Sequence, residues 1–166
     1  MSTESFRCWL VEQDADKRVT SRIAQLDAGD FPDNSSRSGE LPLDQTLIDV
    51  EYSSLNYKDL LAVEGHPGIV KSFPHVPGID AAGRVIRSSD PRYPSGSSVI
   101  VTGYELGQAH WGGWAERVQV PTEWLVPMPD GWSARQAMLM GTAGFTAAQC
   151  VLALQQQGVE PGSGEV

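Results

Sequence analysis

The apolar pattern of this 166-residue chain changes its period once, close to residue 130. Before that point it consists of short runs, several of which alternate with a period of two, separated by Gly, Pro, Ser and Asp. Such runs are typical of short β-strands joined by turns. Beyond it, a capping-box sequence at Ser133–Gln136 opens longer apolar stretches that favour helices. We therefore expect a strand-rich unit over residues 1–130 and helices over residues 131–166.

The strand-rich part predicts a small, partly open barrel, and the fold class is mainly β with helices (α+β). Its first two strands are expected to pair as a hairpin, and its third to bury one face. Ser53 and Ser54 favour the start of a short helix that Gly65 ends. The polar segment 27–45 predicts a long, mobile surface loop. The expected strands are 6–11, 19–26, 46–52, 79–86, 98–102 and 114–120.

The last part of the chain predicts two helices separated by the glycines of residues 141–144, the second over residues 145–157. Glu165–Val166 after the following turn is expected to begin a strand. A helix, a turn and the first residues of a strand are typical of an α/β unit.

Composition limits the classes of partner. The net charge of −9 and scattered basic residues argue against nucleic acid, although four tryptophans lie between residues 111 and 132. These tryptophans are expected to pack in the core and the cleft wall. Cys8 and Cys150 predict neither a disulfide framework nor a metal cluster. We found no signal-peptide core and no apolar stretch near ~18 residues, and therefore expect a cytoplasmic protein without a membrane partner.

Four stretches in order resemble one family: Ser53–Asp59, Pro74–Gly83, His110–Glu116 and Gly141–Ala147. Together they are similar to the medium-chain dehydrogenase/reductase superfamily, in its zinc-free quinone-oxidoreductase-like branch that includes the acrylyl-coenzyme A reductases. The resemblance implies a GroES-like catalytic barrel followed by a Rossmann domain that binds NADPH, with the active site between them. The loop at 27–45 departs from the resemblance because it is longer.

The chain contains no Gly-x-Gly-x-x-Gly motif. We therefore expect the N-terminal part of such an enzyme, truncated after the first helix of the Rossmann domain and inactive alone. Both a cloned fragment and a shortened gene product remain open. The resemblance implies a homodimer for the intact enzyme. For the fragment, the apolar face of the helix around residues 145–154 predicts self-association or a displaced helix.

The resemblance also implies that zinc is absent. Asn56 and the pair Ile79-Asp80 stand where zinc-dependent relatives carry Cys and His-Glu. The histidines lack metal-site spacing. Hydride addition to a conjugated C=C bond does not require a Lewis acid, but it requires a hydrogen-bond donor near the carbonyl oxygen.

The candidate site residues are Asn56, Tyr57, Gly141 and Thr142. Tyr57 is the first candidate for the catalytic donor and, by the resemblance, touches the nicotinamide; whether it donates a proton or only positions is open. Asn56 either bonds cofactor or substrate or caps a loop. Thr142 either caps a helix or bonds the nicotinamide carboxamide, and Gly141 permits close backbone approach. Asp80 is expected to be buried, hydrogen-bonded and structural.

The function that the sequence predicts is NADPH-dependent reduction of an acrylyl-coenzyme A-like enoyl thioester or of a quinone, without zinc. The alternative is a non-catalytic, isolated GroES-like barrel that serves as an interaction or structural module.

Overall fold

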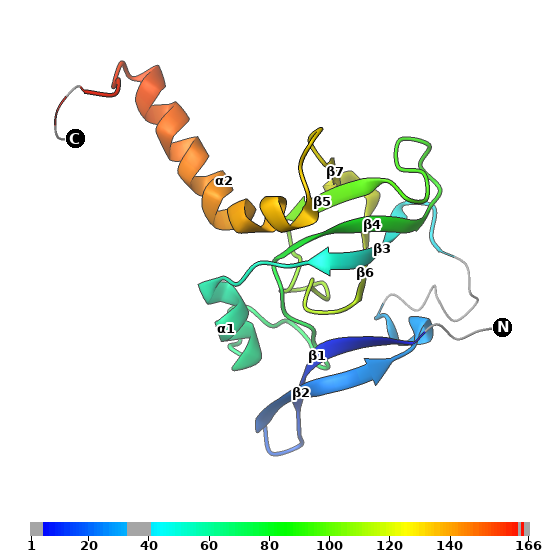
Figure 1. The fold of residues 1–166 in the computed structure, drawn as a ribbon. Coiled ribbons are helices and arrows are strands. Elements are labelled where there is room, and N and C mark those ends of the chain that lie inside the picture. Colours follow the sequence, from blue (N-terminus) through cyan, green and yellow to red (C-terminus); the bar gives the residue numbers. More distant parts are fainter. Residues whose placement is uncertain (1–4, 33–40, 163, 165–166) are drawn as a thin grey trace.

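The structure is a computed structural model, which describes residues 5–32, 41–162 and 164 (Figure 1). Its largest element is a five-stranded antiparallel sheet in the order β6-β3-β4-β5-β7. The mainly β architecture with two α-helices confirms the predicted fold class. The strands of this sheet are β3 (Gln45–Tyr52), β4 (Asp80–Ser88), β5 (Ser98–Thr102), β6 (Arg117–Pro121) and β7 (Val126–Pro127).

A separate hairpin, β1 (Phe6–Gln13) and β2 (Val19–Leu26), lies beside one end of this sheet (Figure 1). Its two strands pair antiparallel along their whole length, which confirms the predicted hairpin. Single bridges from Cys8 to Ala115 and from Val11 to His75 attach β1 to the rest of the barrel. The hairpin therefore closes one side of the molecule without extending the main sheet.

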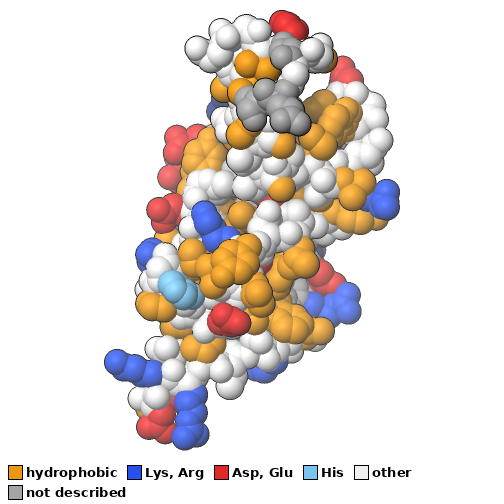
Figure 2. Space-filling view, turned by 90° about the vertical axis from the view of Figure 1, so that its left-hand side faces the viewer, with side chains coloured by type: hydrophobic (Ala, Val, Ile, Leu, Met, Phe, Trp, Pro, Cys, Tyr) orange, Lys and Arg blue, Asp and Glu red, His pale blue; other side chains and the backbone are white. Residues whose placement is uncertain are grey.

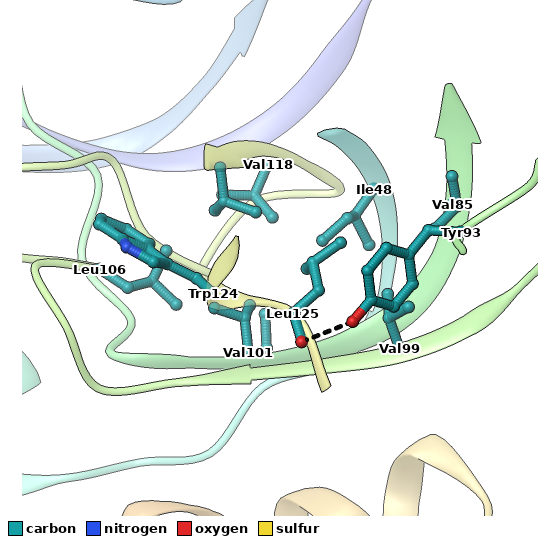
Figure 3. Close-up of a cluster of buried hydrophobic side chains, with 11 residues drawn as sticks. Ile48, Val85, Tyr93, Val99, Val101, Leu106, Val118, Trp124 and Leu125 are labelled. Carbon is teal, nitrogen blue, oxygen red and sulfur yellow. Dashed lines mark hydrogen bonds between the residues drawn. The ribbon is translucent and has the colours of Figure 1, made fainter. Parts of the chain in front are cut away.

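Two apolar clusters fill the barrel, one on each face of β3. The first joins Ile48 to valines of β4, β5 and β6, and Tyr93 closes it by donating a hydrogen bond of 2.8 Å to the carbonyl of Leu125 (Figure 3). The second joins Leu47 to Trp111 and to side chains of the hairpin, such as Phe6 and Leu10. The expectation that the third strand buries one face was wrong for its first half, because the hairpin covers the face that would otherwise meet water.

Gly83, inside β4, lies where the backbones of β3 and β4 approach each other closely. A Cβ atom at this position would collide with the backbone carbonyl oxygen of Asp49, next to a shift in the strand register. The glycine in this strand therefore reflects close backbone approach.

Helix α1 (Tyr57–Val63) begins later than predicted. Its N-cap is Asn56, whose backbone N–H donates to the Asp59 carboxylate in a capping box. Ser53 and Ser54 lie before the helix because their hydroxyls donate hydrogen bonds to Asp80, on β4. A contact distant in sequence thus replaces the local capping role expected for the serines.

Helix α2 (Ala134–Gln156) begins at the predicted N-cap, Ser133, and is kinked at Gly141. The first arm packs against Ala82 of β4 through Ala134, Ala137 and Met138. The second arm, from Thr142 onward, projects away from the barrel (Figure 1). The predicted break between two helices is present, but the second helical arm starts three residues earlier than expected.

Two predicted features fall partly or wholly outside the described residues. Of the predicted loop at 27–45, residues 33–40 lie outside them, and the short 3-10 helix η1 (Ala28–Asp30) begins it. The strand expected to start at Glu165–Val166 also lies outside them.

Candidate active site

The carboxylate of Asp80, the first residue of β4, is fully buried and joins three segments of the chain. Its Oδ1 accepts a hydrogen bond of 2.6 Å from the Thr142 hydroxyl, and its Oδ2 accepts one of 3.0 Å from the Thr142 backbone N–H. Oδ2 also accepts from Asn56 Nδ2 at 3.0 Å and from the Ser54 hydroxyl. Among the described residues no ion pair includes Asp80, so hydrogen bonds stabilise this buried group.

The kink of α2 supplies two of these hydrogen bonds. Gly141 adopts φ 48° and ψ −158°, which interrupts the helix and leaves the N–H of Thr142 to point at Asp80. A Cβ on Gly141 would lie 2.9 Å from Asp80 Oδ2 and 3.2 Å from Ser54. Only glycine adopts this backbone conformation readily, and it also leaves room for the carboxylate. The N-terminus of the second helical arm thus faces the carboxylate of Asp80, an arrangement that the helix dipole favours.

Asn56 reaches the same cluster from the other side. Its Nδ2 donates to Ser54 Oγ at 2.8 Å and to Asp80 Oδ2 at 3.0 Å, while its backbone begins α1. The indole N–H of Trp114 donates to the carbonyl of Ser54 at 3.2 Å and holds this segment from outside. Asn56 therefore caps α1 and also bonds the cluster through its side chain. A bond from Asn56 to cofactor or substrate stays a prediction.

Tyr57 follows Asn56 as the first residue of α1, and its side chain is 76% exposed. It lies next to the cluster in the chain but takes no part in the hydrogen bonds to Asp80. Figure 2 shows hydrophobic side chains gathered on one face of the molecule. Leu55 and Leu60, close to Tyr57 in the chain, are exposed as well, at 78% and 50%.

A second buried carboxylate, Asp59, supports the segment. It accepts hydrogen bonds from the backbone N–H groups of Asn56 at 2.8 Å and Ile79 at 2.9 Å. Loss of hydration on burial raises the pKa of Asp59, against the lowering effect of these bonds. Asp59 thus fastens the start of α1 to the start of β4.

An open cavity of about 410 Å³ lies between the hairpin and the end of β3. Its walls include Trp9, Ile23, Val50 and Trp114. Trp114 also bonds the segment that leads to Asn56, so this cavity adjoins the site. The other tryptophans are divided between roles: Trp111 and Trp124 are buried in the two cores, as predicted, while Trp132 is half-exposed.

The structure thus brings together Asn56, Gly141 and Thr142, with Tyr57 adjoining them in the chain. Asp80 was expected to be structural; neither its bonds to the other candidate residues nor the participation of Ser54 was predicted from the sequence. The only signal available was a single acidic residue in an apolar strand. No group of three or more His, Cys, Asp or Glu that could hold a metal ion occurs among the described residues. Both cysteines, Cys8 and Cys150, are free thiols.

Comparison with known proteins decides the family. The model of the alcohol dehydrogenase GroES-like domain matches residues 42–130, which is more than half of the chain. The chain belongs to this family. The GroES-like match contains Asn56, Tyr57 and Asp80, whereas Gly141 and Thr142 lie beyond it.

Relatives of this GroES-like chain are oxidoreductases. It is 50% identical over 127 residues to the acrylyl-CoA reductase AcuI of Ruegeria pomeroyi, covering 76% of this chain and 38% of that protein. The structure resembles Escherichia coli K-12 YhdH solved with bound NADPH, with 47% identity, a TM-score of 0.80, and coverage of 93% of this chain and 44% of the other. Bacillus subtilis YhfP, solved with NAD bound, gives 42% identity, a TM-score of 0.84, and coverage of 97% and 46%.

The chain spans less than half the length of each of these proteins. The family assignment therefore applies to the GroES-like domain that the chain contains.

By length and composition alone, α2 is long and apolar enough to cross a membrane. This differs from the expectation that no apolar stretch comes near ~18 residues. Glycine, threonine and glutamine interrupt the apolar run in this part of the sequence. The kink at Gly141 leaves a straight arm about 22 Å long at ~1.5 Å per residue, whereas a hydrocarbon core is ~30 Å thick. One such helix is weak evidence for a membrane protein, and we assign it no membrane role.

Proposed function

We propose that this chain is the N-terminal, catalytic-domain part of an NADPH-dependent oxidoreductase that reduces an activated C=C bond, as in an acrylyl-CoA-like thioester, or a quinone. The observation that carries the proposal is the convergence of Asn56 and Thr142 on the buried carboxylate of Asp80, with Tyr57 beside them. Segments far apart in the sequence meet there, next to the kink of α2 at Gly141. The relatives with NADPH or NAD bound support the class of cofactor.

The residues present fit the nicotinamide end of the cofactor. The oxygen of Thr142 keeps free lone pairs after donating its hydrogen to Asp80, and the missing side chain of Gly141 leaves room for the carboxylate that holds this hydroxyl. When bound, the cofactor supplies a hydride to the substrate. The remaining contacts with the dinucleotide would come from a Rossmann domain.

Tyr57 is the proposed donor to the substrate. Its exposed hydroxyl can hydrogen-bond the carbonyl oxygen that gains negative charge when hydride adds to the β-carbon. Asn56 orients the start of α1, and so the backbone that carries Tyr57. In this scheme no metal is needed, because the tyrosine stabilises the charge that a Lewis acid would otherwise stabilise.

The test is NADPH oxidation by the protein encoded by the complete reading frame that contains this chain, with acrylyl-CoA and with a quinone as substrates. We expect turnover with at least one of them, and a loss of roughly 10²-fold or more in kcat for Tyr57→Phe. Tyr104→Phe is the matched control, because Tyr104 is also exposed but stacks on Trp124.

Turnover unchanged by Tyr57→Phe would remove the role of this tyrosine. Absence of NADPH oxidation with both substrates would favour the alternative, a GroES-like barrel that serves as an interaction module. A homodimer and a cytoplasmic location stay predictions.

A further inference from the structure

The direction of each hydrogen bond at Asp80 follows from the chemistry of a carboxylate. An ionised carboxylate has no hydrogen to give, so every group that bonds it must donate. The Thr142 hydroxyl, 2.6 Å from Oδ1, therefore points its hydrogen at Asp80. The same argument applies to the amide of Asn56, whose nitrogen lies 3.0 Å from Oδ2 and whose oxygen must therefore point elsewhere.

The second hydrogen of the Asn56 amide is also used within the protein. Ser54 donates its own hydrogen to Asp80 and accepts from Asn56 Nδ2 at 2.8 Å. Both hydrogens of this amide are thus occupied, and the single hydroxyl hydrogen of Thr142 is occupied as well. Neither Asn56 nor Thr142 keeps a side-chain donor for a ligand, although the oxygen of Thr142 can still accept.

We propose that Asp80 is a positioning residue that sets the hydrogen-bond polarity of the site. It converts Thr142 into an acceptor toward the ligand, so that the group held there is an N–H donor such as a primary carboxamide. It also leaves the Tyr57 hydroxyl as the donor among the candidate residues. The identification of that carboxamide with the nicotinamide rests on the proposed function, whereas the polarity of the site does not.

The polarity is tested in the 166-residue chain without any cofactor. A hydroxyl hydrogen held by a buried carboxylate exchanges slowly enough to be seen by nuclear magnetic resonance. We expect a resonance for the Thr142 hydroxyl in the wild type. In Asp80→Asn it should be lost, and exchange of the Thr142 backbone amide should accelerate by roughly tenfold.

Asp130→Asn is the matched control, since it makes the same change of charge at an exposed position before α2 and should alter neither signal. A wild-type Thr142 hydroxyl that exchanges freely, or an Asp80→Asn protein that keeps its resonance, would overturn the assignment. If Asp80→Asn does not fold, the wild-type resonance and its loss in Thr142→Val decide the question.

The consequence for ligands is tested with the complete protein and two cofactors. NADPH carries a carboxamide, whereas its 3-acetylpyridine analogue keeps the carbonyl but has no N–H. For the wild type and for Thr142→Ser, we expect the KM for NADPH to be at least tenfold lower than the KM for the analogue. This difference between the two cofactors should disappear in Thr142→Val and Asp80→Asn.

A purely structural role for Asp80 would raise the KM for both cofactors equally and keep their ratio, which would overturn the proposal. A wild-type protein that oxidises neither cofactor would instead contradict the proposed function, and the measurements on the 166-residue chain would still decide the polarity.

Discussion

His75 is a buried base that makes the stability of the barrel depend on pH. Its side chain is 1% exposed, and its Nε2 lies 2.9 Å from the carbonyl oxygen of Gly107. Burial lowers the pKa of His75, although the bond to Gly107 opposes this effect. Because the folded protein holds this ring neutral, its stabilising contribution is complete above the unfolded pKa of about 6.5 and is lost as the pH falls.

We therefore expect the free energy of unfolding to decrease below pH ~6.5, by up to roughly 1.4 kcal/mol per pH unit. Chemical denaturation of the wild type and of His75→Gln at several pH values measures the effect. Glutamine can keep a donor near Gly107 but does not titrate, so this variant should show a flatter profile between pH 5 and 7. Identical profiles for the two proteins would contradict the assignment.

At the scale of elements, the kink of α2 depends on one residue. Gly141→Ala would place a Cβ 2.9 Å from Asp80 Oδ2 at a positive φ, so we expect a loss of about 1–3 kcal/mol in unfolding free energy. Gly144→Ala is the matched control. There φ is ordinary, and the added Cβ would lie 2.9 Å from the flexible end of Met140 and 3.1 Å from its Cβ, so a smaller effect than that of Gly141→Ala is expected. Thermal unfolding followed by circular dichroism distinguishes the two, and equal effects would show that the kink is not specific to glycine.

The elements that sequence could predict are those whose causes are local. The hairpin, strand β5 and the Ser133 cap of α2 appear at their expected places because alternation and capping are short-range signals. The start of α1 was predicted wrongly, since Ser53 and Ser54 bond Asp80, which lies more than 25 residues later. The convergence at Asp80 could not be derived from the pattern, because a buried acid in a strand does not indicate its partners.

At the scale of the whole molecule, the second arm of α2 exposes an apolar face. Phe145 and Leu152 are each 57% exposed and lie two turns apart on the same side of the helix. We expect the 166-residue chain to self-associate through this face. Light scattering across a range of concentrations should show a mass above 18.0 kDa that rises with concentration.

The double variant Phe145→Ser/Leu152→Gln should shift the chain toward a monomer. Leu43→Gln, at a leucine that is 85% exposed before β3, should leave the association unchanged. A wild-type chain that stays monomeric at every concentration would refute this prediction.

The kink at Gly141 divides α2 into two arms, and Asp80 is hydrogen-bonded at the point where they meet. The short arm is fixed to the barrel by Ala137 and Met138, and the long arm extends free of it. Swinging the long arm about this joint must stretch the bonds from Thr142 to the carboxylate. A domain or partner that packs against the C-terminal end of α2 and moves it would therefore change the hydrogen bond of the Thr142 hydroxyl to Asp80.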